Sequence, residues 1–390
     1  MRFLRPILIF TSILAGIGVI LFGIYGNKYT PPRFESAAFA EQDLTNAMQK
    51  IADATVEGGA PGALIHVRKG GETFDVTAGL ANKATTQPMR AELPLRVASI
   101  SKIYTATVIH SLANQGVLNL DTTLNEILPQ DVLSGVPNAK EATVRQLLYH
   151  TSGIPDYYDL RSYLFEDWRE PISLERMLPH VRRMNATGAP GEKYTYSNTG
   201  FLYLGAVAEA VSGRPLKELI TAFVIEPLEL SSTFYNVRQT SDQDIHGYGT
   251  YLRPWKDATI YWEHSGPDSG IMASASDVAL FLEALTFEGG ELHANIGRPM
   301  LGSLIQRATR REQGLGIETI VTRSGEKMIG HTGSAFGYKT LAFALPHRDL
   351  VFVAHVNCEC DTMVISMLRN IFVAIGATDK SYEQEASGSR

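Results

Sequence analysis

The sequence predicts a mixed α/β (α+β) fold, with one antiparallel sheet built from both chain ends, flanking helices and a mostly helical lobe. Two observations predict the sheet. Residues 41–78 carry a helix pattern followed by a β-hairpin pattern, and residues 316–375 carry three β-prone runs followed by an apolar helix. A third observation predicts the lobe, because residues 121–312 between these ends have helical periodicity and long loops.

The elements at the two ends have clear local signals. Apolar residues recur at helical spacing on one face of residues 41–56. The β-prone runs 63–67 and 74–78 are separated by a turn that contains Gly70-Gly71, which is typical of a hairpin. At the C-terminal end, the predicted strands are residues 316–322, 341–345 and 350–356, and the predicted helix is residues 363–375.

Three further helices are predicted inside the chain. Each is apolar and ends near a glycine, which readily adopts the left-handed conformation that terminates helices. The spans are residues 99–114 ending near Gly116, residues 201–211 ending at Gly213, and residues 275–287 opening at Ser276-Asp277 and closing at Gly289-Gly290.

The N-terminus has the pattern of a membrane segment. Arg2 and Arg5 precede an apolar run at residues 6–24, and about 20 apolar residues suffice to cross a bilayer. We favour an uncleaved anchor over a cleaved signal peptide, whose apolar region is shorter. Either alternative exports the rest of the chain. The predicted organisation is an anchor or signal segment at 1–27, a linker at 28–42, one large globular domain at 43–378 and a polar tail at 379–390.

Composition excludes several classes of function. The chain has 390 residues, 44 % of them hydrophobic, and a formal net charge of -6, so we expect no nucleic-acid partner. Walker-type phosphate loops, Gly-x-Ser-x-Gly and His-Glu-x-x-His are absent. We expect no metal and no cofactor. The two cysteines, Cys358 and Cys360, are too close in sequence for an unstrained bridge, and we expect them to be small buried residues.

The strongest chemical signal is Ser99-Ile100-Ser101-Lys102 at the start of a predicted helix. Positions i and i+3 share a helix face, so the lysine amine lies beside the serine hydroxyl. A desolvated lysine can lose its proton and activate a serine. Taken alone, the pattern fits a capped core helix equally well. A second copy, residues 324–327, contains a glycine between two β-prone runs and is interpreted as a hairpin turn.

Two further segments carry polar groups suited to catalysis. Tyr196-Ser197-Asn198 combines a phenol that can relay a proton with an amide that can bind a substrate amide. His331-Thr332-Gly333-Ser334 combines groups that can bind a carboxylate with small residues that allow a ligand to approach the backbone.

The order and spacing of these three elements resemble the serine β-lactamases and penicillin-binding proteins. The tyrosine in the middle element resembles the class C branch with its DD-carboxypeptidase and esterase relatives. Flanking segments at residues 147–155, 226–228 and 269–277 are similar to that branch as well. The resemblance covers residues 43–375 and implies a β-lactamase-like fold.

The resemblance implies a role for each site residue. Ser99 would attack the substrate carbonyl and become acylated, while Lys102 and Tyr196 would share the proton transfers. Asn198 would bind the acyl side chain. The N–H groups of Ser99 and Ser334, the latter directly after Gly333, would form an oxyanion hole. His331 and Thr332 would receive a substrate carboxylate.

The implied function is hydrolysis, through an acyl-enzyme, of D-alanyl-type peptides or related small amides and esters. Peptidoglycan and β-lactams are included among the expected partners. A β-lactamase, a carboxylesterase and a penicillin-binding sensor or scaffold without turnover remain alternatives. His331 stands where many class C β-lactamases carry lysine. Because histidine is only partly charged at neutral pH, this difference argues against an efficient β-lactamase.

Overall fold

The computed structural model describes residues 44–376 except 160–161, 163–165, 169, 238–243, 250–255, 260–265 and 323. The predicted membrane segment, the linker and the polar tail lie outside the described residues. Within the described part of the chain, no helix combines the length and the apolar character needed to cross a bilayer.

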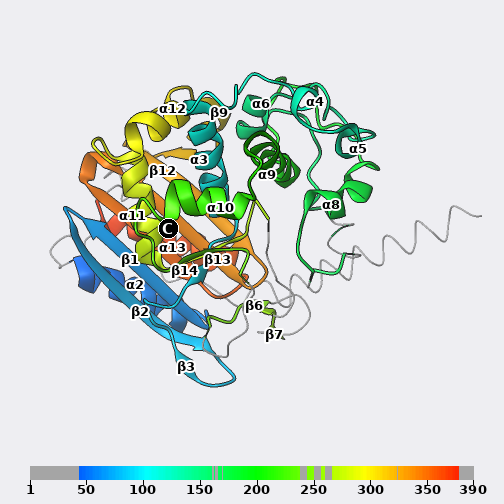
Figure 1. Cartoon of the computed structure of the whole chain (residues 1–390). Coiled ribbons are helices and arrows are strands. Elements are labelled where there is room, and N and C mark those ends of the chain that lie inside the picture. The colour runs from blue at the N-terminus through cyan, green and yellow to red at the C-terminus, as the bar shows by residue number, and fades with distance from the viewer. Residues whose placement is uncertain are drawn as a thin grey trace, which may run out of the picture.

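A nine-stranded sheet forms the centre of the structure, in the order β3-β2-β1-β14-β13-β12-β11-β10-β9 (Figure 1). All its neighbouring strands pair antiparallel. The pairing of β1 with β14 joins the two ends of the chain, which confirms the predicted fold class. The strands are β1 (Gly62–Lys69), β2 (Glu72–Asn82), β3 (Gln87–Pro88), β9 (Ile305–Ala308), β10 (Arg311–Gln313), β11 (Glu318–Val321), β12 (Lys327–Ala335), β13 (Tyr338–Leu345) and β14 (Leu350–Val356).

The central strands of the sheet are buried on both faces. On β14, Phe352 belongs to one apolar cluster with residues of α2 (Leu44–Glu57) and α13 (Asp361–Ala374). Its neighbour Val353 belongs to the other cluster, with residues of α3 (Ser101–Asn114) and α11 (Ala275–Thr286). Successive strand residues point to opposite faces, so a continuous apolar strand is expected where both faces are covered.

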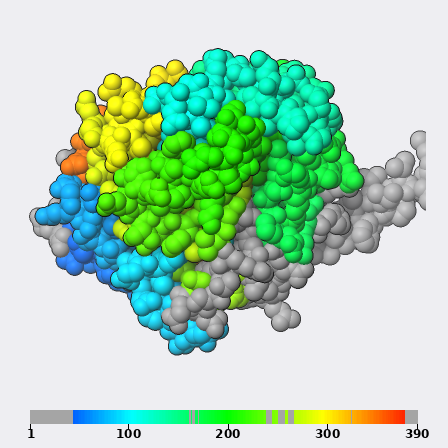
Figure 2. Space-filling view, viewed as in Figure 1, coloured from blue at the N-terminus to red at the C-terminus, as the bar shows by residue number. Residues whose placement is uncertain are grey.

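The predicted helical lobe is present, and α9 runs through it. In the space-filling view, the green segment that contains α10 lies at the front, between the blue hairpin and the cyan part of the lobe (Figure 2). The helices of the lobe are α4 (Leu124–Ile127), α5 (Gln130–Leu133), α6 (Val144–Leu148), α8 (Leu174–Val181), α9 (Asn198–Ser212) and α10 (Leu216–Ile220). A further helix, α12 (Arg298–Leu301), precedes β9. Short helical turns are η2 (Ala98–Ile100), η3 (Thr221–Ile225), η5 (His293–Gly297) and η6 (Pro346–Arg348).

Most predicted helix ends are confirmed. Gly213 ends α9 with a left-handed φ of 68°. The third internal helix, α11, begins at Ala275 as predicted, but its N-cap is Ser274 rather than Ser276, because the Ser274 side chain accepts a hydrogen bond from the Asp277 N–H. Small additional sheets were not predicted, since their strands are only two or three residues long. They are β4 (Leu95–Arg96), β8 (Ile271–Ala273) and β5 (Thr233–Tyr235), and β6 (Tyr248–Gly249) with β7 (Lys256–Asp257).

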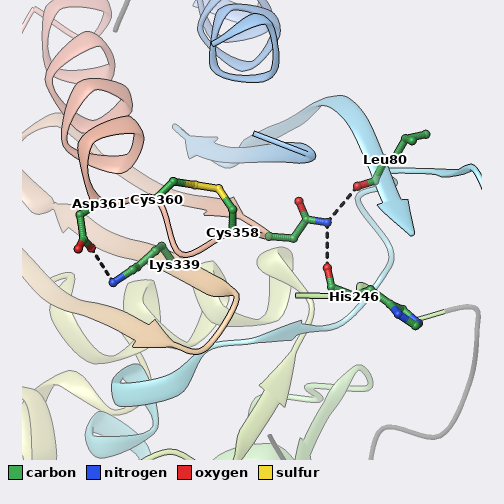
Figure 3. Close-up of a disulfide and its surroundings, with 7 residues drawn as sticks. Leu80, His246, Lys339, Cys358, Cys360 and Asp361 are labelled. Atoms are coloured by element: carbon green, nitrogen blue, oxygen red, sulfur yellow. Dashed lines mark hydrogen bonds and ion pairs between the residues drawn. A yellow bond between two sulfur atoms is a disulfide. The ribbon is translucent and has the colours of Figure 1, made fainter. Parts of the chain in front are cut away.

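Cys358 is buried as predicted, but the expectation that the two cysteines are not bridged is wrong. Cys358 and Cys360 form a disulfide directly after β14 (Figure 3). Their Cα atoms lie 5.3 Å apart, within the usual range for a bridge, because the chain turns between them as it passes from β14 to α13. Spacing in sequence alone did not reveal this turn. Beside the disulfide, Lys339 forms an ion pair with Asp361 at 2.6 Å.

Candidate active site

Ser99 lies where the small sheet β4-β8-β5 meets the main sheet. It is the middle residue of η2, which continues directly into α3. The preceding residue, Ala98, has a φ of 48°, a left-handed conformation that residues with a Cβ atom rarely adopt. This sharp change of direction between β4 and α3 places Ser99 at the N-terminal end of the helix.

Strand β12 packs closely against η2. A Cβ atom added at Gly333 would lie under 3.0 Å from the carbonyl oxygen of Val97, so only glycine fits there. Ser334 follows on the same strand, and its hydroxyl accepts a hydrogen bond from Lys339 Nζ at 2.5 Å. The two N–H groups predicted to form the oxyanion hole, those of Ser99 and Ser334, therefore belong to two elements in direct contact.

Lys102 is buried and makes three hydrogen bonds. Its Nζ atom donates to Ser99 Oγ at 3.2 Å, to Asn198 Oδ1 at 2.7 Å and to the backbone oxygen of Asp268 at 3.0 Å. Burial lowers the pKa of Lys102 to about 8, while the carboxylates of Asp268 and Asp156 oppose that change. Lys102 therefore has a neutral fraction at neutral pH and lies within reach of the Ser99 hydroxyl.

Tyr196 is held between aromatic rings and the lysine. Burial raises its pKa well above the usual value, although a hydrogen bond with Ser99 opposes this. The ring of His150 lies 4.4 Å from that of Tyr196, and Lys102 Nζ lies 5.2 Å from the Tyr196 ring centre. Tyr196 is therefore a neutral phenol near pH 7, suited to relaying a proton rather than to acting as a phenolate base.

Asn198 begins α9 and connects Lys102 to a residue that the sequence did not single out. Its Nδ2 atom donates to Asp156 Oδ2 at 3.0 Å, and its backbone N–H donates to Asp156 Oδ1 at 3.0 Å. Burial raises the pKa of Asp156 to about 7. The signal that could have found Asp156 is its position directly after the family-like segment 147–155.

Asp268 is a second buried carboxylate that sequence reasoning missed. It is 2 % exposed, its Oδ2 atom accepts from the Tyr157 hydroxyl at 2.9 Å, and it lies 3.9 Å from Lys102 Nζ. Burial raises its pKa, while Lys102 and Tyr157 oppose that rise. Asp268 immediately precedes the family-like segment 269–277, which would have been the only sequence signal.

His331 is placed near Tyr196, with ring centres 6.3 Å apart, but it is only 3 % exposed. Its Nδ1 atom donates to the backbone oxygen of Thr332 at 2.5 Å, and its Nε2 atom faces Glu318 Oε1 at 3.4 Å. Glu318 also accepts from Arg307 at 2.7 Å. Burial lowers the pKa of His331, and the Glu318 carboxylate opposes this. Both ring nitrogens are thus already occupied by protein groups.

The structure therefore brings Ser99, Lys102, Tyr196 and Asn198 together and places β12 beside them. The Beta-lactamase family model matches residues 42–372. The chain belongs to the beta-lactamase family. It is a hydrolase with the fold of that family, as the sequence predicted, and the roles assigned to single residues stay predictions.

Similar proteins include both penicillin-binding proteins and enzymes named for D-amino acid substrates. Penicillin-binding protein 4* of Bacillus subtilis (strain 168) is 25 % identical over 323 residues, 77 % of this chain and 69 % of that protein. The D-aminopeptidase of Brucella anthropi is 24 % identical and the match covers 82 % of this chain, but this chain spans only 61 % of that enzyme's length.

Solved structures agree on the fold. The D-stereospecific amidohydrolase from Streptomyces sp. is 25 % identical with a TM-score of 0.74, and the match covers 85 % of this chain and 99 % of that chain. D-amino acid amidase from Ochrobactrum anthropi SV3, in complex with L-phenylalanine amide, is 23 % identical with a TM-score of 0.74, and the match covers 86 % and 99 %. At that identity, the second similarity shows the fold alone.

Proposed function

We propose that this protein hydrolyses amides of D-amino acids, and more slowly short D-alanyl-type peptides that end in a free carboxylate, through an acyl-enzyme on Ser99. The observation that carries the proposal is the contact between Lys102 Nζ and Ser99 Oγ at 3.2 Å, made by a buried lysine whose pKa is lowered to about 8. The names of the D-aminopeptidase, D-stereospecific amidohydrolase and D-amino acid amidase relatives support the substrate class.

In this proposal, neutral Lys102 takes the Ser99 proton as the hydroxyl attacks the substrate carbonyl. The Ser99 and Ser334 N–H groups stabilise the oxyanion that forms. Tyr196, held as a phenol, relays the proton to the leaving amine. Asn198 binds the acyl side chain of the substrate. Water, activated by the same groups, then releases the acid.

The surroundings of His331 favour a neutral leaving group over a free carboxylate. Burial lowers the pKa of His331, so its ring carries little positive charge near neutral pH. Glu318, 3.4 Å from His331 Nε2, forms an ion pair with Arg307 at 2.7 Å, so these two charges balance each other. A substrate that ends in a carboxylate therefore gains little electrostatic attraction near His331, and a substrate that ends in a neutral amide is at no disadvantage there. This argues for an amidase over a carboxypeptidase or a β-lactamase.

The test compares substrates on purified full-length protein. We expect D-alanine amide to release ammonia faster than L-alanine amide, D-alanyl-D-alanine or benzylpenicillin. Ser99→Ala is the control and should lower kcat by about 10³-fold or more. If benzylpenicillin or D-alanyl-D-alanine is the better substrate, or if Ser99→Ala retains the activity, the proposal is refuted.

For the location, we propose that residues 6–24 anchor the protein in the membrane and keep the hydrolase domain outside the cytoplasm. Arg2 and Arg5 before the apolar run support this orientation. In cell fractions, we expect the full-length chain to stay with the membrane after an alkaline wash, and to become accessible to added protease when the outer compartments are opened. Recovery of a shortened, washable protein would instead indicate a cleaved signal peptide.

A further inference from the structure

Asp156 faces hydrogen-bond donors on both oxygens of its carboxylate. Oδ1 accepts from the backbone N–H groups of Asn198, at 3.0 Å, and Tyr158, at 3.2 Å. Oδ2 accepts from Asn198 Nδ2 at 3.0 Å. Because two of these donors belong to Asn198, Asp156 accepts hydrogen bonds from both the backbone and the side chain of the residue that begins α9.

This contact fixes which way the Asn198 amide points. The oxygen and nitrogen of an asparagine amide have nearly the same shape, so hydrogen bonds alone decide between its two orientations. With Nδ2 donating to Asp156, Oδ1 must face Lys102, where it accepts at 2.7 Å. The reversed amide would set an NH2 group against Lys102 Nζ and an oxygen against the Asp156 carboxylate.

The amide orientation in turn decides what Lys102 presents to Ser99. Asn198 Oδ1 and the backbone oxygen of Asp268 can only accept, so they take two N–H groups of Lys102. The remaining tetrahedral position faces Ser99 Oγ at 3.2 Å. In the neutral amine, that position holds the lone pair, which is what a base needs in order to take the serine proton.

We propose that Asp156 is a positioning residue for acylation, because it holds the Asn198 amide in the one orientation that leaves the Lys102 lone pair for Ser99. The inference rests on the proposed acylation of Ser99. Other charged groups act on Asp156 as well: Lys102 from α3 attracts its carboxylate, and Asp268, just before β8, repels it. These charges affect the titration of Asp156 but not which amide atom it selects.

Exchanging carboxylate and amide between the two positions separates this role from simple structural support. In Asp156→Asn, the new amide must turn its oxygen to the backbone N–H groups of Asn198 and Tyr158. Its NH2 group then faces Asn198 Nδ2, and that clash is relieved only when the Asn198 amide reverses. In the double variant Asp156→Asn/Asn198→Asp, the carboxylate at position 198 accepts from both Lys102 and the new amide, so every hydrogen bond is restored.

The experiment measures the second-order rate of Ser99 acylation by p-nitrophenyl acetate, followed by intact mass from pH 5 to 10 on the full-length protein. We expect Asp156→Asn to be acylated about 10²-fold more slowly than the wild type. Asn198→Asp alone sets two carboxylates against each other and should be slow as well. The carboxylate at position 198 raises the pKa of Lys102 and moves the acid limb to higher pH, so the comparison is made on the alkaline plateau, where Lys102 is neutral. There the double variant should be at least about tenfold faster than either single variant.

The exposed carboxylate of Asp121, paired with Arg145, provides the matched control, and Asp121→Asn should be acylated at the wild-type rate. Melting curves of every variant report folding. Wild-type rates for Asp156→Asn, or a double variant no faster than the faster single variant on the alkaline plateau, would overturn the inference. Lack of D-alanine amide hydrolysis by the wild type would refute the proposed substrate instead, because acylation by the ester does not depend on it.

Discussion

Replacing Asp268 by asparagine removes a buried negative charge beside the proposed base. Asp268 Oδ2 lies 3.9 Å from Lys102 Nζ, and both side chains are at most 3 % exposed. The carboxylate favours the ammonium form of Lys102. Asparagine keeps the shape and an oxygen that can accept from the Tyr157 hydroxyl, so the substitution changes the charge and little else.

The size of the effect follows from the distance. Two unit charges about 4 Å apart interact by about 4 kcal/mol at an effective dielectric constant of about 20, which corresponds to about 3 pKa units. Burial also raises the pKa of Asp268, so its charge is incomplete until the pH exceeds that value. We therefore expect Asp268→Asn to lower the pKa of Lys102 by about one to three units from its value of about 8.

The sign of the prediction can be checked in a pH profile. The neutral amine of Lys102 is the reactive form, and a lower pKa makes it available at lower pH. The acid limb of kcat/KM should therefore move to lower pH in Asp268→Asn. A substrate without titratable groups, such as p-nitrophenyl acetate, ensures that the limb reports the free enzyme.

Asp121→Asn is again the matched control, since it removes an exposed carboxylate, and its acid limb should coincide with that of the wild type. An acid limb of Asp268→Asn that stays in place, or moves to higher pH, would refute the reasoning. It would mean that Lys102 is not the group whose deprotonation limits acylation, or that Asp268 carries no charge in the working pH range.

Two further predictions test the packing and the buried charges. Gly333→Ala forces β12 away from the Val97 carbonyl. We expect a loss of about 1–3 kcal/mol in the free energy of unfolding and a fall in kcat of about 10²-fold. Unchanged kcat with unchanged Tm would contradict the close contact. Arg307→Ala leaves the Glu318 carboxylate, 3 % exposed, without its cation; urea unfolding should show a loss of about 3–5 kcal/mol. The exposed pair of Arg214 with Glu218 is the control, and Arg214→Ala should change stability by no more than about 0.5 kcal/mol.

The three chemical motifs needed little from tertiary structure to be found. Ser99 and Lys102 are three residues apart, so helical geometry alone brings them to one face. The hydrophobic patterns of β14 and of the helices at both ends could also be recognised in the sequence. A strand that is buried on both faces is a continuous apolar run, whereas a helix that is buried on one face has apolar residues at regular intervals. The second Ser-x-x-Lys copy was correctly assigned to a turn, since Lys327 pairs with Val321 across the hairpin of β11 and β12.

What only the tertiary structure decided is the set of charges around those motifs. The segments containing Asp156, Asp268 and Glu318 lie far from Ser99 in sequence, and no local pattern states that these carboxylates converge on Lys102 or His331. The same holds for the disulfide between Cys358 and Cys360, which depends on a turn after β14. Periodicity records which residues are buried, because burial repeats with the geometry of a helix or strand. It does not indicate which buried polar groups contact one another, because each such contact joins two distant segments only once and produces no repeating pattern in the sequence.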